Sequence, residues 1–373
     1  MLHDYEIIVK ISTLDARVLI FTSVNCSLFN LNEYYICDLF IFYINGFTDK
    51  LTDVNVCAIM ISRLRLFVKQ GWVFMKNQIE KLKKVKNAVI LAHYYAPAEV
   101  QGIADYVGDS FYLAKIAKQS DADIIVFCGV RFMGESAKIL NPDKKVPMPD
   151  LTADCPMAHM VADGIIEEMR NTYDDLAVVC YINSTAELKC QSDVCVTSSN
   201  AVKIVKTLPN KNIFFIPDRN LGSFVAKQVP EKNIILNDGC CPIHAKITAA
   251  QVIAEKQNHP SALVLTHPEC EPDVVALADY IGSTADIIAY AKTSEVSEFI
   301  ICTEDGVDYK LVTDNPDKRF YYPDPHPCCA DMKLNTLETV LSVLEKEDKE
   351  IIVDRDISEG ALKPLLRMLE LGK

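Results

Sequence analysis

Three cysteine positions recur along the chain at a nearly constant interval. Cys155 lies in "LTADCPMAH", Cys241 lies in "DGCCPIH", and the third position is Cys328 or Cys329 in "HPCCADMK". The intervals are 86 residues and then 87 or 88 residues. Thiolates bind soft metals such as iron and zinc, and His244 follows Cys241 at the third position. The spacing predicts a site to which three parts of the chain each contribute one thiol.

The other cysteines have a simpler explanation. The chain has fourteen cysteines in all, and it opens without the basic segment and small-residue cleavage site of a signal peptide. Without a secretory route thiols stay reduced, which favours metal binding or catalysis over disulfides. We expect about ten of the fourteen to be small buried hydrophobic side chains.

Charge and hydropathy exclude several classes of partner. The formal net charge is −13, and no stripe of lysine and arginine alternates with aromatic residues, so we expect no binding to nucleic acid or to anionic membranes. No apolar stretch reaches the roughly 18 residues of a spanning helix. With 373 residues, half of them hydrophobic, the chain can bury a large core in two or three domains. We expect a cytoplasmic protein.

The elements that would position the thiols form a threefold repeat. Short apolar runs typical of buried parallel strands occur in three sets, each followed by helical periodicity: 87–95, 176–184 and 262–270; 123–130, 212–218 and 298–304; and 144–150, 232–237 and 318–324. Ile90, Val178 and Val264 match at intervals of 88 and 86 residues. The helical segment 104–117 resembles 278–291, two periods later.

This repeat predicts an α/β protein of three pseudo-threefold-related α/β/α domains with parallel sheets and an active site on their common axis. The expected domains are 75–160, 161–246 and 247–330, and residues 331–373 form a C-terminal helical segment that packs back on the first. Residues 1–74 show no repeat and lack proline. We expect either that translation starts downstream, near Met75, or that this extension is disordered; an accessory domain is the alternative.

Polar side chains stand at the carboxyl ends of the first strand in each repeat. Ligands of open α/β sheets bind beyond those ends, and there we expect the cysteines as well. The residues keep the register of the repeat and favour a shared site: His93 and Tyr95, Tyr181 and Asn183, and His267 and Glu269.

The segments "LAHYYAPAEVQGIADYVGDS", "VFCGVRFMGESAKILNPDKKV", "DCPMA", "GCCPIH", "THPEC" and "CADMKLNTLE" together resemble the quinolinate synthase family. The resemblance covers residues 75 to about 345 and implies three α/β/α domains around a [4Fe–4S] cluster. It also implies a reaction in which iminoaspartate and dihydroxyacetone phosphate condense to quinolinate, with release of phosphate and water. Three cysteine ligands leave one iron open to act as a Lewis acid. L-aspartate oxidase or aspartate dehydrogenase would supply iminoaspartate, with possible channelling.

The resemblance also implies roles for individual residues. The expected cluster ligands are Cys155, Cys241 and Cys329. The cysteines not expected to bind the cluster are Cys128, Cys240, Cys270 and Cys328. Catalytic roles fall to His93, Tyr95, Tyr181 and Glu269. Glu269 is the acid/base, which we expect to retain its proton more readily among anionic substrates. The resemblance adds further substrate-binding residues, which bind phosphate or carboxylate: Ser110, Asn183, Ser198, His244, His267 and Thr284. Ser110 and Ser198 are expected near helix starts.

Two other classes of function remain open. A non-catalytic iron–sulfur carrier or sensor would use the three cysteines but not the polar residues at the strand ends. A zinc hydrolase could use cysteine and histidine at these spacings and would be colourless. The ring of candidate carboxylate-binding side chains favours the enzyme.

Overall fold

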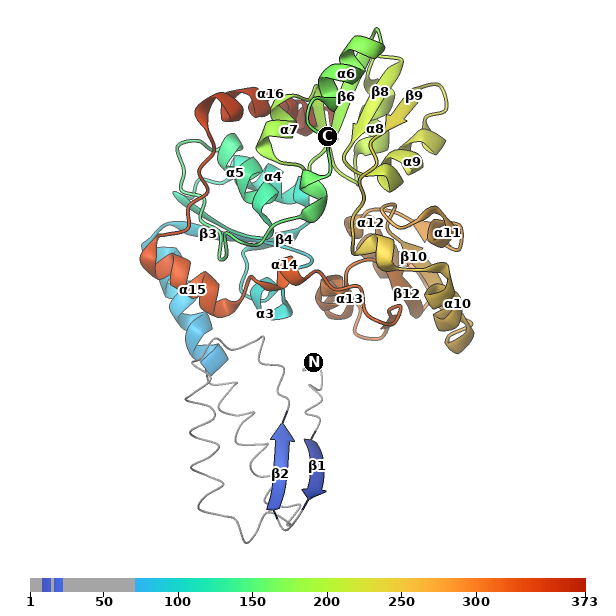
Figure 1. Ribbon diagram of the computed structural model, residues 1–373. Helices are drawn as coiled ribbons and strands as arrows, with labels where there is room; N and C mark the ends of the chain where they lie inside the picture. Colours follow the sequence, from blue (N-terminus) through green and yellow to red (C-terminus); the bar gives the residue numbers. More distant parts are fainter. Residues whose placement is uncertain (1–8, 15–16, 23–70) are drawn as a thin grey trace. The chain divides into compact units, whose positions relative to one another are not determined.

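Three small parallel sheets follow one another along the chain, joined by helices (Figure 1). The computed structural model describes residues 9–14, 17–22 and 71–373. The chain divides into two compact units, Met1–Phe74 and Met75–Lys373. In the first unit, β1 (Val9–Leu14) pairs antiparallel with β2 (Arg17–Thr22). The prediction that residues 1–74 are a misplaced start or a disordered extension lies mostly outside the described residues.

The strand orders of the three sheets are related by the repeat. In each sheet the first strand of the repeat is central, with a short strand on one side and the second long strand on the other. The first sheet has the order β4-β3-β5, with β3 Ala88–His93, β4 Tyr106–Gly108 and β5 Ile124–Cys128. The second has the order β7-β6-β8-β9, with β6 Leu176–Tyr181, β7 Val194–Val196, β8 Asn212–Ile216 and β9 Asn233–Leu236. The third has the order β11-β10-β12-β13, with β10 Leu263–Thr266, β11 Tyr280–Ile281, β12 Glu298–Cys302 and β13 Arg319–Tyr321.

One hydrogen-bonded motif confirms the register of the three repeats. In each, an aspartate just before the short strand accepts the backbone N–H of a residue in the central strand and donates its own N–H to that residue's carbonyl. The carboxylate bonds measure 2.8, 2.7 and 2.8 Å, and the backbone bonds all measure 2.9 Å. The pairs are Asp105 with Ile90, Asp193 with Val178 and Asp279 with Val264, so the strand residues are those matched from the sequence.

Helices cover both faces of the sheets. In the third repeat, α12 and α13 pack on one face through Ile287 and Leu311. On the opposite face lie α10 and α11, through Val252 and Val274. The α/β/α fold class is thereby confirmed. The helices of the three repeats and their connections are α3 Ala98–Gln101, α4 Ser110–Gln119, α5 Arg131–Leu140, α6 Ile165–Thr172, α7 Ala186–Cys190, α8 Ala201–Thr207, α9 Arg219–Gln228, α10 Ala249–Asn258, α11 Pro272–Val275, α12 Thr284–Thr293 and α13 Asp308–Asp314, with 3-10 turns Pro156–His159, His244–Lys246 and Asp305–Val307.

The C-terminal segment closes over the first two repeats. It contains α14 (Ala330–Lys333), α15 (Leu337–Lys346) and α16 (Arg355–Leu371). Helix α15 contacts β5, whereas α16 lies along α7 and β7 and also touches α5 (Figure 1). The hydrophobic core of the first two repeats is continuous, and α16 contributes Ala361, Leu365 and Met368 to it. The segment therefore joins the first repeat to the second, and the four domain boundaries expected from the sequence stay predictions.

The strand expected over 144–150 is wrong. Only a single bridge joins Ile124 to Lys145, although the carbonyls of Lys145 and Pro147 accept the backbone N–H groups of Ile125 and Phe127 at 2.9 and 3.0 Å. Proline has no N–H to donate to a ladder, and Pro147 and Pro149 lie within the segment. Among the described residues, no helix has both the length and the apolar character needed to cross a membrane.

Candidate active site

The central strands of the three sheets deliver polar side chains to one buried cluster. His93 is the last residue of β3, Tyr181 is the last residue of β6, and His267 directly follows β10. His93, Tyr181, His267 and Glu269 are all at most 6% exposed. Long apolar strands bring these side chains inside because both faces of each sheet are covered. The structure therefore brings together five of the six strand-end residues singled out in the sequence: His93, Tyr95, Tyr181, His267 and Glu269.

Glu269 lies at the centre of this cluster. Its Oε2 is 2.9 Å from Nδ1 of His244, and its Oε1 accepts a short hydrogen bond from the Tyr181 hydroxyl. The same Nδ1 of His244 lies 3.2 Å from Sγ of Cys241. The carboxylate, the imidazole and the thiol thus meet within hydrogen-bonding distance, although they come from the second and third repeats.

The protein's own side chains favour the ionised form of Glu269. Burial alone would raise its pKa, but His244, His267 and the Tyr181 hydroxyl stabilise the charged form and lower the pKa to about 2. The surrounding side chains of the protein favour the ionised carboxylate. The prediction that Glu269 retains its proton concerns this carboxylate beside bound anionic substrates, and it stays a prediction.

Two buried histidines share one tautomer. The backbone N–H of Tyr95 donates to Nδ1 of His93 at 3.2 Å, and the backbone N–H of Glu269 donates to Nδ1 of His267 at 3.3 Å. An Nδ1 that accepts a hydrogen bond leaves the ring proton on Nε2. Burial lowers the pKa of His93 to about 3, and burial lowers the pKa of His267 to about 3. Both rings are therefore neutral, with one N–H each to offer.

A chain of hydroxyl groups extends the cluster toward the first repeat. Nε2 of His244 lies 2.9 Å from Oγ1 of Thr303. The Tyr95 hydroxyl lies 2.8 Å from that oxygen and 2.7 Å from Oγ1 of Thr284. The sequence reading missed Thr303, although it directly follows β12, as His267 follows β10.

The three expected anion-binding hydroxyl residues occupy equivalent places. Ser110 begins α4 and Thr284 begins α12, so both lie where free backbone N–H groups attract anions. Ser198 follows β7 in the same register, but α8 starts only at Ala201. Oδ1 of Asn200 accepts the Thr197 N–H and forms a turn that separates Ser198 from the helix, and the expected anion-binding role of Ser198 stays a prediction. The buried Oδ1 of Asn183 has no hydrogen-bond partner among the described residues, which suits a polar group that contacts a ligand.

Backbone hydrogen bonds show which cysteine of each adjacent pair, Cys240 or Cys241 and Cys328 or Cys329, matches Cys155 of the first repeat. In each repeat, a residue just beyond the second long strand donates its backbone N–H to a carbonyl group. That carbonyl belongs to the residue two positions before one of the cysteines. These bonds are Arg131 to Ala153 at 2.9 Å, Arg219 to Gly239 at 2.7 Å and Asp305 to Pro327 at 2.9 Å. The cysteines in register are consequently Cys155, Cys241 and Cys329, while Cys328 is exposed.

These three thiols lie near one another. All three are partly buried against the same core, all three are free, and Cys155 interacts electrostatically with both Cys329 and Cys241. Burial raises the pKa of Cys155 to about 12 and the pKa of Cys329 to about 11. Thiols held protonated in this way become thiolates when a metal binds them.

Two groups of side chains could each hold a metal ion. Their donor atoms lie within 4.8 Å of one another among the described residues: Cys241, His244 and Glu269, and Glu304, Asp305 and Cys328. Each group contains a cysteine from one of the vicinal pairs. Thiol, imidazole and carboxylate groups are all metal ligands in proteins, so the chemistry of these residues fits a metal cofactor.

The comparisons with known proteins agree with this geometry. The model of the family "Quinolinate synthetase A protein" matches residues 77–370. A quinolinate synthase of Caldicellulosiruptor saccharolyticus is 54% identical over 298 residues, which cover 80% of this chain and 98% of the relative. The quinolinate synthase of Fusobacterium nucleatum is also 54% identical, covering 80% and 99%. That of Aquifex aeolicus is 48% identical over 303 residues, covering 80% and 94%. The chain belongs to the quinolinate synthetase A family.

Proposed function

We propose that this protein is a quinolinate synthase, which condenses iminoaspartate with dihydroxyacetone phosphate to quinolinate and releases phosphate and water. The observation that carries the proposal is that one thiol from each repeat packs against a common core, and that one of them, Cys241, contacts His244 beside the buried Glu269 and Tyr181. A metal site alone would not need the carboxylate and hydroxyl groups around it. The names of the relatives support the same reaction.

We assign Cys155, Cys241 and Cys329 as the ligands of a [4Fe–4S] cluster. Three free thiols in register, all packed against the same core, support this assignment. Bound there, such a cluster supplies one iron without a cysteine ligand, which acts as a Lewis acid on a substrate oxygen.

The chain's own residues bind and orient the two anionic substrates. Neutral His93 and His267 each offer Nε2–H to a carboxylate or a carbonyl oxygen. Ser110 and Thr284 supply hydroxyl groups at the starts of ten-residue helices, where the helix dipole favours the phosphate. Asn183 and Ser198 complete the polar lining. Because the site is buried, these contacts act in a medium that strengthens them.

Glu269 moves the protons of the reaction. Its ionised carboxylate accepts a proton from the substrate, and Tyr181 and His244 on its two oxygens fix its orientation. The hydroxyl chain of Tyr95, Thr303 and Thr284 reaches His244 from the other side. A positioned acid or base of this kind contributes about 10²–10⁴-fold in rate.

The decisive experiment measures cluster content and turnover in the same preparation. Protein purified without oxygen should be brown, should contain iron and acid-labile sulfide, and should form quinolinate from the two substrates. A colourless zinc protein, or a brown protein without turnover that passes its cluster to an acceptor, would reject the proposal. The eleven described cysteines are all free, which suits a reducing cytoplasm. Direct transfer of iminoaspartate from L-aspartate oxidase or aspartate dehydrogenase can be tested by adding a trap for free iminoaspartate.

A further inference from the structure

Two buried carboxylates bind the backbone of two of the three cysteines in register. Oδ2 of Asp218 accepts the N–H of Cys241 at 3.1 Å, and Oε1 of Glu304 accepts the N–H of Cys329 at 2.9 Å. Asp218 is 0% exposed and Glu304 is 1% exposed. Each lies two residues beyond the second long strand of its repeat, β8 or β12, so the two are equivalent in the fold although one is an aspartate and the other a glutamate.

The second oxygen of each carboxylate anchors a different segment. Oδ1 of Asp218 accepts the N–H of Leu221 at 2.7 Å and caps α9. Oε2 of Glu304 accepts the N–H of Gly306 at 2.7 Å and caps the 3-10 turn Asp305–Val307. Each carboxylate therefore ties the cysteine loop to the rigid start of a helical element, which fixes where the cysteine backbone lies.

The first repeat lacks this arrangement. The equivalent position beyond β5 is Val130, which is buried and apolar. The N–H of Cys155 bonds instead to Oδ1 of the adjacent Asp154 at 2.7 Å, and the Asp154 side chain is 37% exposed. The buried carboxylate thus serves the second and third cysteines only.

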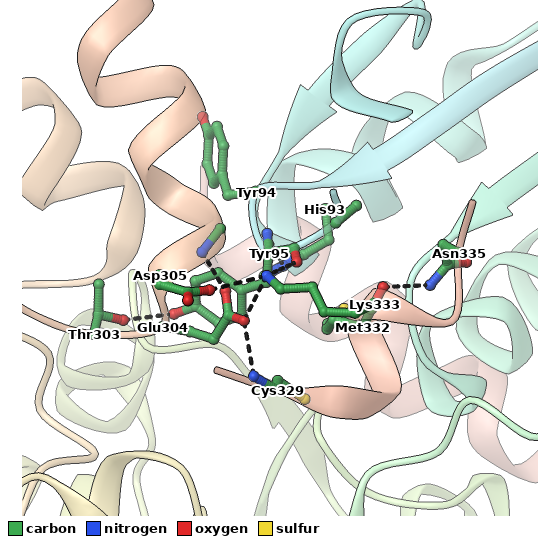
Figure 2. A network of polar contacts seen from close by, with 12 residues as sticks. His93, Tyr94, Tyr95, Thr303, Glu304, Asp305, Cys329, Met332, Lys333 and Asn335 are labelled. Atoms are coloured by element: carbon green, nitrogen blue, oxygen red, sulfur yellow. Dashed lines mark hydrogen bonds and ion pairs between the residues drawn. The ribbon is translucent and has the colours of Figure 1, made fainter. Parts of the chain in front are cut away.

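Glu304 extends the contact into the first repeat through Lys333. The Lys333 ammonium lies 2.8 Å from Oε1 of Glu304, 3.1 Å from Oδ1 of Asp305 and 3.0 Å from the carbonyl of Tyr95 (Figure 2). The turn approaches Tyr95 so closely that a Cβ at Gly306 would lie 2.7 Å from the Tyr95 Cα. Glycine is required there, and one carboxylate links Cys329 to the strand end that carries His93 and Tyr95.

We infer that Asp218 and Glu304 are positioning residues for the iron–sulfur site, acting through the backbone N–H of Cys241 and of Cys329. The inference rests on the proposed [4Fe–4S] site. Groups that orient metal ligands typically change metal affinity by 10–100-fold when they are replaced. Replacing either carboxylate by its amide keeps the shape of the side chain. The new NH₂ group then faces one of the two backbone N–H donors and cannot accept its hydrogen bond, so one of the two anchored segments is released.

The experiment compares Asp218→Asn and Glu304→Gln with the wild type and with Asp279→Asn. Asp279 also accepts a backbone N–H, but the donor is Val264 in the repeat motif and not a cysteine. Each protein is purified without oxygen. Iron and sulfide are counted, the rate of iron loss to a chelator is followed by visible absorption, and the reduced cluster is examined by electron paramagnetic resonance. Thermal unfolding reports on the fold.

Iron loss at least about tenfold faster and an altered resonance spectrum in Asp218→Asn and Glu304→Gln, but not in Asp279→Asn, would support the inference. Unchanged chelation and an unchanged spectrum would overturn it. Iron loss that only follows a lowered melting temperature, equally in Asp279→Asn, or failure of both variants to fold, would also overturn it, because the carboxylates would then serve the fold alone. A wild-type protein without iron would instead reject the proposed function.

Discussion

Nδ1 of His244 lies 2.9 Å from Oε2 of Glu269, with the two side chains 2% and 3% exposed. The histidine follows a cysteine of the second repeat, and the glutamate follows the central strand of the third. The contact therefore joins the candidate metal site to the candidate proton acceptor. Because each group is deeply buried, each depends on the other for a hydrogen-bond partner.

Glu269→Gln should keep the cluster and lose most of the turnover. An amide cannot accept a proton at neutral pH, and it cannot accept hydrogen bonds from Tyr181 and His244 through both of its polar atoms. We expect kcat to fall by about 100-fold or more, with iron and sulfide content unchanged. The matched control is Glu271→Gln, since Glu271 is partly exposed and pairs with Arg219 at 2.7 Å. A near-normal rate in Glu269→Gln would remove the residue from the acid/base role.

Serine at Cys155, Cys241 or Cys329 should abolish the cluster and the activity. Serine at the neighbouring Cys240 or Cys328 should leave a brown protein, because these thiols fall out of the register set by the Gly239 and Pro327 carbonyls. Cys128 is buried at the end of β5 and Cys270 is buried in the segment after β10, and both should behave like Cys240 and Cys328. Visible absorption and iron content decide between the two sets. Loss of iron in Cys240→Ser together with its retention in Cys241→Ser would show that the register is wrong.

Lys333→Met should destabilise the fold strongly. It leaves the carboxylate of Glu304 buried without its cation, and breaking a buried pair in this way costs about 3–5 kcal/mol. Lys292→Met is the control, because Lys292 is 63% exposed and lies 3.7 Å from Asp314, and such surface pairs contribute only about 0–1 kcal/mol. Urea unfolding curves of both variants give the comparison. Equal losses would mean that Glu304 does not depend on Lys333.

Stability should fall as the pH falls below 6.5, in part through His93. Burial lowers the pKa of His93 from 6.5 to about 3, so between these values the unfolded chain binds a proton that the folded chain does not. Stability therefore rises with pH in this window, and His93 contributes about 1 kcal/mol of the change between pH 5.5 and 7.0. In His93→Gln that part of the pH dependence should vanish. A wild-type slope in His93→Gln would contradict the assignment.

A chain that begins at Met75 should fold and turn over at the rate of the full chain. All three sheets and the whole candidate site lie in the unit Met75–Lys373, and the family match begins at residue 77. Steady-state kinetics and thermal unfolding of the shortened and full-length proteins provide the test. Loss of folded protein or of activity on shortening would assign residues 1–74 a function in the enzyme.

The sequence alone determined the repeat and most of the strand-end residues. Buried parallel strands are continuous apolar runs, so their positions, and the polar residues that follow them, are visible in the chain. That local signal located His93, Tyr181 and Glu269. It failed over 144–150. This segment has apolar residues like those of a strand, but its prolines cannot donate the N–H groups of a strand ladder. It did not show the turn that the Asn200 side chain forms between Ser198 and the start of α8.

Only the tertiary structure decided which of two adjacent cysteines lies in register and which groups surround Glu269. Spacings of 87 and 88 residues cannot separate Cys328 from Cys329, whereas the bond from Asp305 to Pro327 does. Thr303, Asp218 and Glu304 carry no motif of their own, since their role comes from contacts with residues up to 208 positions away. The ionised state of Glu269 likewise depends on histidines and a tyrosine that surround it only after folding. The local sequence pattern predicts which residues lie at the end of a strand. The burial and the charge state of their side chains depend on the segments that pack around that end.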